Sequence, residues 1–158
     1  MDQREFVRTF QPLLPKVSAY LNRRVATQDV EDVASKVFEI AWARRKSCPE
    51  GHELAWLYKI CSNVVSNERR KQRNIWQLAE LFESDHAAPS AEDLAIANIS
   101  LRHAIASLKA SDRQIIALFA IDGLKLGEIA IALGISANSA TQRLKRARAR
   151  LADELEEK

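Results

Sequence analysis

The chain of 158 residues has few of the residues that disulfide-stapled or β-rich proteins need. It contains two cysteines, four glycines and four prolines, and 6% of its residues are aromatic. Because Cys48 and Cys61 form no CxxC pair, they exclude a zinc-finger pattern and are consistent with a reducing compartment, most simply as two ordinary thiols. The scarcity of glycine, proline and aromatic residues favours an all-α fold.

Long apolar runs are also missing. No stretch approaches the roughly 20 apolar residues that a transmembrane helix needs. Charged residues occupy the N-terminal stretch, where a signal peptide would be apolar. We therefore expect a cytoplasmic protein without membrane insertion, and the hydrophobic fraction of 47% excludes wholesale disorder.

The residues that would support catalysis are scattered. His52, His86 and His103 have no partner at a metal-ligand spacing, and the sequence has neither a glycine-rich phosphate loop nor a nucleophile elbow. We therefore expect no enzymatic activity, no metal and no cofactor.

Basic residues are absent from one central segment. Residues 75–101 contain five acidic residues and no Lys or Arg, whereas residues 1–74 have a net charge of +5 and residues 102–158 one of +3. Two basic blocks joined by an acidic segment suggest two contacts with a polyanion. The sequence therefore predicts two small helical domains, 1–74 and 96–158, joined by a flexible acidic linker at 75–95.

Helical periodicity recurs through both blocks. In the first block it predicts helices over 3–25, interrupted by Pro12 and Pro15, over 28–45 with Thr27 as N-cap, and over 54–73. A loop is expected at 47–53. In the linker, 75–82 could form a turn of helix and 84–93 should be mobile. The second block should begin with a helix over 96–109, followed by one that starts at a Ser111–Gln114 capping box.

Residues 126–150 carry the most informative pattern. The first helix there should end at Gly134, because glycine adopts the left-handed cap conformation at little steric cost. Ser136 is a suitable N-cap for the next helix. Two short helices joined by a tight turn are typical of a helix-turn-helix. The inward positions would be Ile129, Ala130 and Leu133 in the first helix, and Ala140, Leu144, Ala147 and Leu151 in the second.

The second of these helices has a basic outer face, with five basic and no acidic residues between Glu128 and Asp153. Amide and guanidinium groups near its start can pair with base edges in the major groove, and later arginines can neutralise phosphates. The alternative is an amphipathic hairpin whose basic face is only solvated.

The predicted helix over 54–73 combines aromatic residues with a basic end. Trp56 and Tyr58 lie near its start, and Arg69, Arg70 and Arg73 lie near its end. Single-stranded nucleic acids bind to such combinations of stacking platforms and phosphate contacts. The alternatives are that Trp56 belongs to the core and that the basic run is a solvated helix end.

In this order, the motifs resemble those of the extracytoplasmic-function (ECF) sigma factors of bacterial RNA polymerase. The resemblance covers nearly the whole chain. Region 2 is suggested by 29–33, Val37-Phe38, Ala41-Trp42, 55–60, Asn63 and Arg69-Arg70. Region 4 is suggested by Leu108, Arg113, Asp122-Gly123, 128–130, 133–136 and 143–148.

The resemblance implies a transcription initiation factor that binds core RNA polymerase, promoter DNA and an anti-sigma factor. The polymerase-binding residues would be Asp29, Asp32, Val33, Lys36 and Phe38. The melted −10 element would meet His52, Trp56, Asn63, Asn67, Arg70 and Arg73. The duplex −35 element would meet Asn138, Ser139, Thr141, Gln142, Arg143 and Arg146.

The chain also departs from the family pattern. Asn138-Ser139-Ala140-Thr141 stands where the family often has Gly-Thr-Val-Lys, so promoter preference cannot be copied from a relative. Two other interpretations remain open. A one-component helix-turn-helix regulator would bind duplex DNA without polymerase, and a helical interaction protein would use its basic faces to dock an acidic partner.

Overall fold

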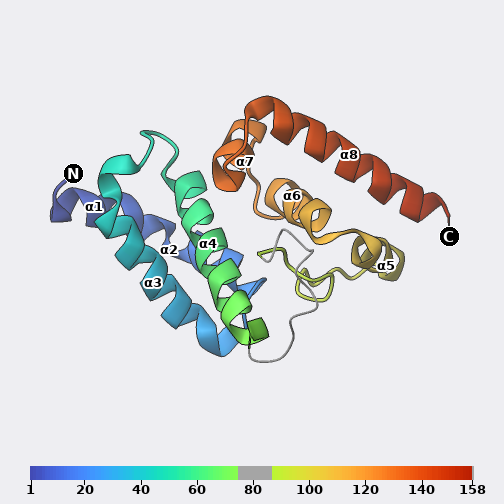
Figure 1. The fold of residues 1–158 in the computed structure, drawn as a ribbon, viewed down its shortest axis with the longest axis horizontal. Coiled ribbons are helices and arrows are strands. Elements are labelled where there is room, and N and C mark those ends of the chain that lie inside the picture. Colours follow the sequence, from blue (N-terminus) through green and yellow to red (C-terminus); the bar gives the residue numbers. More distant parts are fainter. Residues whose placement is uncertain (75–86, 158) are drawn as a thin grey trace.

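The computed structural model describes residues 1–74 and 87–157, and every regular element in those two ranges is a helix (Figure 1). The predicted all-α class is confirmed. Helices α1 to α4 form an N-terminal group and α5 to α8 a C-terminal group, and α4 packs against α7 where the groups meet. No described helix is both long and apolar enough to cross a bilayer.

The N-terminal group begins with α1 (Gln3–Phe10). Its start is stabilised by a capping box, in which the Glu5 N–H donates to the Asp2 carboxylate and the Asp2 N–H donates to the Glu5 carboxylate. The interruption predicted at Pro12 is confirmed, because Gln11–Leu13 form a 3₁₀ turn before α2 (Leu14–Asn22). Proline fits the first turn of a helix, where its missing N–H is not needed.

Helix α3 (Val30–Ala43) buries one face against α2 and α4. The prediction of Thr27 as its N-cap is wrong. Thr27 lies in a 3₁₀ turn (Thr27–Asp29), and its hydroxyl donates to the Asn22 side chain at 3.3 Å. The Val30 N–H already donates to the Thr27 carbonyl, so the turn leads the chain into α3 without a side-chain cap.

Helix α4 (Glu53–Asn74) follows a short loop in which Gly51 has φ of 79°. That left-handed conformation explains why the chain can reverse at this point. The buried residues of α4 lie within its first four turns, and they are Ala55, Trp56, Leu57, Tyr58, Ile60, Cys61, Val64 and Val65.

The C-terminal group consists of α5 (Ile99–Ser107), α6 (Ala110–Ala120), α7 (Leu126–Leu133) and α8 (Ala137–Glu156). The predicted Ser111–Gln114 capping box is wrong, because α6 starts at Ala110 with Lys109 in the cap position and no side-chain cap. Gln114 is instead 1% exposed and bonds to side chains of the N-terminal group.

One hydrophobic cluster extends through both groups and includes Leu57 of α4 and Ile129 of α7. The segment after the undescribed residues 75–86 also joins the packing. Ala87 and Pro89 are buried, and Ala91 and Leu94 pack in a second cluster with α5 and α6. We expected 84–93 to be mobile, but within 87–93 the small and apolar side chains of Ala87, Ala88, Pro89 and Ala91 are buried, and Arg69 and Arg113 donate to backbone carbonyls of this segment. The predicted short helix at 75–82 lies outside the described residues.

Candidate nucleic-acid interface

The helix-turn-helix predicted at 126–150 is present. Gly134 ends α7 with φ of 66°, and the Ile135 N–H donates to the Ala130 carbonyl at 3.0 Å. The Ser136 hydroxyl caps α8 by accepting from the Ser139 N–H at 3.1 Å. Of the expected inward residues, Leu133 and Leu151 are half-buried and the others are buried. The turn therefore sets a fixed angle between α7 and α8.

Replacing Gly134 by alanine is expected to lower the free energy of unfolding by about 1–2 kcal/mol, because a Cβ is disfavoured in the left-handed conformation. Crowding is not the cause, since the new Cβ would lie 3.5 Å from the Lys59 side chain, an ordinary contact. Gly127→Ala, in open space within α7, should instead raise stability by about 0.4–1 kcal/mol. Urea unfolding of both variants tests this, and changes of the same sign would contradict it.

The six residues proposed for the −35 element are all exposed on α8, within its first three turns. Two of them have their hydroxyls engaged, since Thr141 donates to the Ala137 carbonyl at 3.0 Å and Ser139 bonds to Ser136. Within the described residues, the Asn138, Gln142 and Arg143 side chains have no hydrogen-bond partner, so they are available for one outside the chain. The six are Asn138, Ser139, Thr141, Gln142, Arg143 and Arg146.

A polar hollow of about 240 Å³ lies between the start of α6 and this face of α8. Its walls include Lys109 and Arg143, together with Arg150, which pairs with Asp112 at 2.6 Å. Four cationic side chains against one carboxylate favour an anion. Sequence reasoning missed Lys109, Ser111 and Arg150 as part of this surface, because only folding brings the start of α6 beside α8. The lining residues are Lys109, Ser111, Asp112, Arg143, Arg146 and Arg150.

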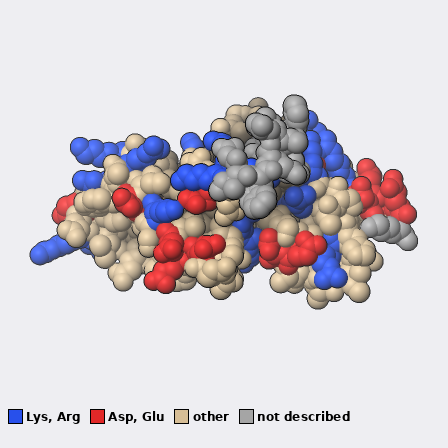
Figure 2. Space-filling view, turned by 60° about the horizontal axis from the view of Figure 1, so that its bottom comes forward, with Lys and Arg blue, Asp and Glu red and all other residues tan. Residues whose placement is uncertain are grey.

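Charge along α8 changes sign near its C-terminal end. Basic residues extend to Arg150, and acidic ones follow from Asp153. Figure 2 shows a cluster of acidic side chains at the end of the molecule that carries the C-terminus, beside a group of basic ones. The basic part of the helix alone therefore suits a nucleic-acid backbone, and the acidic end would point away from it.

A polar face of α4 holds three of the residues proposed for the −10 element. Asn63, Asn67 and Arg70 are exposed at i, i+4 and i+7, so they share one helical face. Asn67 also lines a shallow hollow between α3 and α4 with Lys71. Arg73 is half-buried and lies one turn after Arg70. The structure therefore aligns amide and guanidinium groups in one row.

The other two −10 candidates are placed apart from this row. His52 is exposed in the loop before α4, and its backbone N–H donates a hydrogen bond to the Pro49 carbonyl. Trp56 is 8% exposed, and its ring centroid lies 6.0 Å from that of Phe10, which stacks on Phe6. The core interpretation of Trp56 fits these contacts.

The residues proposed for polymerase binding lie in and just before α3, and they differ in exposure. Asp29 and Asp32 are exposed, whereas Val33 is 5% exposed and belongs to the main hydrophobic cluster. Lys36 is exposed, and its ammonium donates to the Glu68 carboxylate of α4 at 2.8 Å. This pairing raises the pKa of Lys36 and lowers that of Glu68.

Phe38, the fifth polymerase-binding candidate, is half-buried at a groove of about 810 Å³ between α2 and α3. Exposed apolar side chains lie on the same group of helices, including Leu14 in the groove itself. Such a groove can take an apolar helix face. The lining residues are Leu14, Ser18, Ala19, Asn22, Thr27, Val30, Glu31, Ala34, Ser35 and Phe38.

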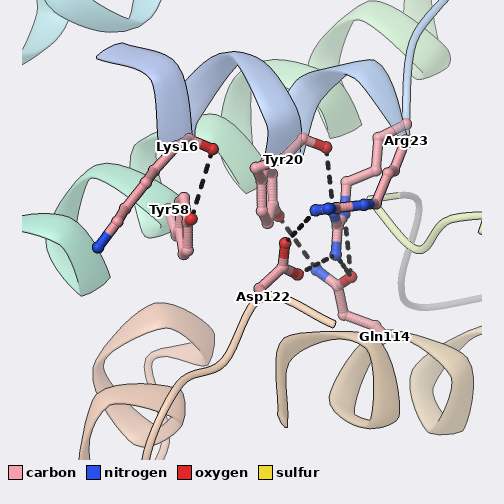
Figure 3. A network of polar contacts seen from close by, with 7 residues as sticks. Lys16, Tyr20, Arg23, Tyr58, Gln114 and Asp122 are labelled. Carbon is pink, nitrogen blue, oxygen red and sulfur yellow. Dashed lines mark hydrogen bonds and ion pairs between the residues drawn. The ribbon is translucent and has the colours of Figure 1, made fainter. Parts of the chain in front are cut away.

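The two helical groups are joined by a buried polar cluster that sequence reasoning did not find. We call it the interdomain network, and Figure 3 shows its members converging from α2, α6 and the turn after α6. Arg24 donates to the Gln114 side-chain carbonyl from Nε at 3.2 Å and from Nη2 at 2.8 Å. Its Nη2 also contacts the Asp122 carboxylate at 3.2 Å. The members are Tyr20, Arg23, Arg24, Gln114 and Asp122.

The remaining contacts complete the network. Arg23 donates to the other Asp122 oxygen at 2.9 Å. The Gln114 amide donates to the Tyr20 hydroxyl at 3.2 Å, and the Arg24 guanidinium stacks over the Tyr20 ring with Cζ 3.6 Å from its centroid. Burial raises the pKa of Tyr20 to about 12, so its hydroxyl stays protonated near neutral pH.

A signal for this network exists in the sequence, but it is incomplete. Gln114 falls on the buried face of α6 between Ala110 and Ala117, and a buried polar side chain needs a hydrogen-bond partner. Nothing in the spacing identifies that partner, because Arg24 is 90 residues away. The Arg23-Arg24 pair looks like an ordinary solvated helix end.

Across residues 1–74 and 87–157, no three His, Cys, Asp or Glu side chains are arranged to hold a metal ion. His86 lies outside the described residues. Both thiols have raised pKa values, to about 11 for the half-buried Cys48 and about 12 for the buried Cys61, mainly because each is partly or wholly removed from water.

Comparison with known families identifies the two helical groups. Residues 9–75 match the family model of sigma-70 region 2, and residues 98–151 match that of sigma-70 region 4. The RNA polymerase sigma factor CnrH of Cupriavidus metallidurans is 30% identical over an alignment of 136 residues, and the match covers 78% of this chain and 71% of CnrH. The chain belongs to the sigma factors of RNA polymerase. Its resemblance to the ECF group is thereby confirmed.

Solved structures of sigma factors share the fold. The sigma factor RpoE of Bartonella quintana, crystallised with the anti-sigma factor NepR, has a TM-score of 0.67 at 24% identity, covering 97% of this chain and 98% of that one. CnrH with the cytosolic domain of CnrY has a TM-score of 0.62 at 25% identity, covering 98% and 90%. The function is therefore that of a transcription initiation factor that directs core RNA polymerase to promoters. Neither alternative interpretation is favoured.

Proposed function

We propose that the sigma factor divides its work between two domains, 1–74 and 96–158, and uses the residues described above for three contacts. The observation that carries this proposal is the separation of two polar faces, one on α4 and one on α8, within a single chain that matches regions 2 and 4. The chain itself would catalyse no reaction, bind no cofactor and act in the cytoplasm, where polymerase forms the phosphodiester bonds.

Region 4 would bind the −35 element as duplex. The exposed start of α8 has the shape and chemistry for the major groove, with Asn138, Gln142 and Arg143 toward base edges. In the hollow between α6 and α8, the side chains of Lys109, Arg146 and Arg150 would receive a backbone phosphate, because these three cations outnumber the one carboxylate there. Phosphate contacts position the helix and base contacts give the sequence preference.

Region 2 would hold the −10 element as a melted strand. The row formed by Asn63, Asn67 and Arg70 can follow the strand along α4. His52 and the loop before α4 would form the wall of a pocket for a nucleobase that is flipped out of the stacked strand. Trp56 would support strand binding indirectly, because its buried side chain packs the start of α4 in place.

Polymerase would dock on α3 through its exposed residues. Asp29, Asp32 and Lys36 supply charged contacts, and the groove beside Phe38 supplies apolar area. We also propose an anti-sigma partner, since RpoE of Bartonella quintana was crystallised with one and the structure of CnrH holds the cytosolic domain of CnrY. An exposed apolar groove on an idle factor is a surface that such a partner can cover.

The test is run-off transcription with bacterial core RNA polymerase, a pool of genomic promoter fragments, and the protein present or absent. Specific transcripts that need the protein support the proposal, and their start sites locate both elements. Tight duplex binding without transcripts would point instead to a one-component regulator.

Arg143→Ala is expected to weaken binding to the cognate −35 duplex by about 1–3 kcal/mol while leaving binding to scrambled DNA nearly unchanged, because a paired base contact is lost. Fluorescence anisotropy at fixed salt measures both affinities. Arg148→Ala is the matched control, since Arg148 lies over the Phe119 ring, further along α8 than the six proposed −35 residues. Equal losses on cognate and scrambled DNA would assign Arg143 to phosphate only.

A further inference from the structure

One carboxylate lies among the cations of the hollow between α6 and α8. The Asp112 side chain is 8% exposed, and its Oδ2 accepts a hydrogen bond from Nη1 of Arg150 at 2.6 Å. The other charged residues that line the hollow are cationic, namely Lys109, Arg143 and Arg146. A carboxylate repels phosphates, so it lowers the attraction of this surface for DNA. Asp112 therefore has a role other than attracting the anion.

Asp112 is held in place by the start of α6. Its backbone N–H donates to the Lys109 carbonyl at 3.1 Å, and Ala110 and Gln114 on either side of it are buried. The positive end of the helix dipole offsets part of the cost of burying its charge. The carboxylate is therefore a fixed point on the wall of the hollow.

Arg150 combines an exposed side chain with one anchored end. Its side chain is 47% exposed, and Nη1 is the atom that donates to Asp112. A guanidinium has five N–H donors in a planar fork, so this bond leaves donors for a phosphate. An arginine without an anchor would lose rotamer freedom on binding, which weakens affinity. Holding Arg150 in advance removes part of that cost.

The place of Arg150 on α8 suits a phosphate contact. Arg143, Arg146 and Arg150 fall at i, i+3 and i+7, so they share one face of the helix. Arg150 lies about 10 Å along the helix axis from Arg143, and the major groove is about 8.5 Å deep. When Arg143 reaches base edges, Arg150 is therefore near the rim of the groove, where the phosphates lie.

We propose that Asp112 is a positioning residue for −35 binding, which holds the Arg150 guanidinium at the wall of the hollow so that its remaining donors meet a backbone phosphate. This inference rests on the phosphate contact proposed above for region 4. Asp112 itself touches no DNA and acts through Arg150. Because phosphates carry no sequence information, its contribution is to the affinity for any duplex and not to sequence preference.

Two substitutions that remove the same charge separate positioning from simple electrostatics. Asp112→Asn releases Arg150, so binding should weaken about three- to fivefold, equally on cognate and scrambled duplexes. Asp153→Asn is the matched control, since Asp153 is exposed on α8 one turn after Arg150. It should leave binding unchanged or make it up to about twofold tighter, because less negative charge faces the DNA.

The experiment is fluorescence anisotropy of the full-length protein with both duplexes over a range of salt concentrations, with circular dichroism to verify helix content. Arg150→Gln should weaken binding to both duplexes and reduce the slope of log affinity against log salt by about 0.9, the value for one phosphate contact. Adding Asp112→Asn to Arg150→Gln should cause no further loss, because Asp112 acts through Arg150. An ion pair that only joins α6 to α8 would leave the salt slope unchanged.

The outcomes distinguish the two proposals. Asp112→Asn binding as tightly as the wild type would overturn the positioning role, and so would a loss that persists in the Arg150→Gln background. If Asp112→Asn loses helix content, Asp112→Ser repeats the test, because serine suits the start of a helix. An unchanged salt slope in Arg150→Gln would refute the proposed phosphate contact, and the positioning role with it. A reduced slope there with an unaffected Asp112→Asn would refute the positioning role alone.

Discussion

Leu144→Ala is expected to lower the free energy of unfolding by about 2–5 kcal/mol. Molecules in which region 4 has unfolded as a result should no longer bind the −35 duplex. Leu144 is 4% exposed and belongs to the main hydrophobic cluster, on the inner face of α8 that packs against α6 and α7. Truncation leaves a cavity that rigid helices cannot fill. Urea unfolding gives the stability, and anisotropy with a −35 duplex gives the affinity.

Lys145→Ala, one residue further along α8, is the control for this prediction. Lys145 is exposed, so its loss should change stability by no more than about 0.5 kcal/mol. Its effect on DNA binding should be that of a single phosphate contact, reducing the salt dependence without changing sequence preference. If both variants lost stability equally, the assignment of the inner and outer faces of α8 would be wrong.

Trp56→Ala is expected to destabilise the protein by about 3–5 kcal/mol, which is the usual cost of truncating a buried tryptophan. The ring is 8% exposed and lies in the aromatic cluster with Phe10. The start of α4 should loosen as a result, and −10 strand binding should fall with it. Chemical denaturation followed by circular dichroism measures the stability change.

Two further variants separate packing from contact. Trp56→Phe keeps most of the apolar volume, so it should restore much of the stability. Asn63→Ala should leave stability within about 0.5 kcal/mol of the wild type, because Asn63 is exposed, but should weaken binding of a single-stranded −10 oligonucleotide. A Trp56→Ala protein as stable as the wild type, with lost strand binding, would show that Trp56 acts mainly as a stacking platform.

Local signals predicted much of the secondary structure. Gly134 and Ser136 occupy the cap positions expected of them, and Pro12 interrupts the first helix. These features depend only on the backbone conformation of a few neighbouring residues. That conformation is set by the side chains of the same residues, so it can be predicted locally. The two failed caps, at Thr27 and Ser111, show where that reasoning stops. At Thr27 the chain forms a 3₁₀ turn instead of a side-chain cap. At Ser111 the expected partner Gln114 instead accepts a hydrogen bond from Arg24, 90 residues away.

The candidate site was predictable to a similar degree. Periodicity alone placed the six −35 candidates on the outer face of α8, where all six are exposed. For Trp56 the sequence left both core packing and base stacking open, because burial at the start of a helix depends on packing partners from elsewhere in the chain. The hollow beside α8 was also invisible, since Lys109 and Arg150 meet only after folding.

By itself, the sequence determined the helical class, the helix-turn-helix and the family, because these depend on short-range pattern and on motifs in a fixed order. Only the tertiary structure decided how regions 2 and 4 meet. Arg24 and Asp122 are 98 residues apart, and no periodicity relates them. Their pairing follows from packing α4 against α7, which excludes water and leaves the buried charged groups to satisfy one another.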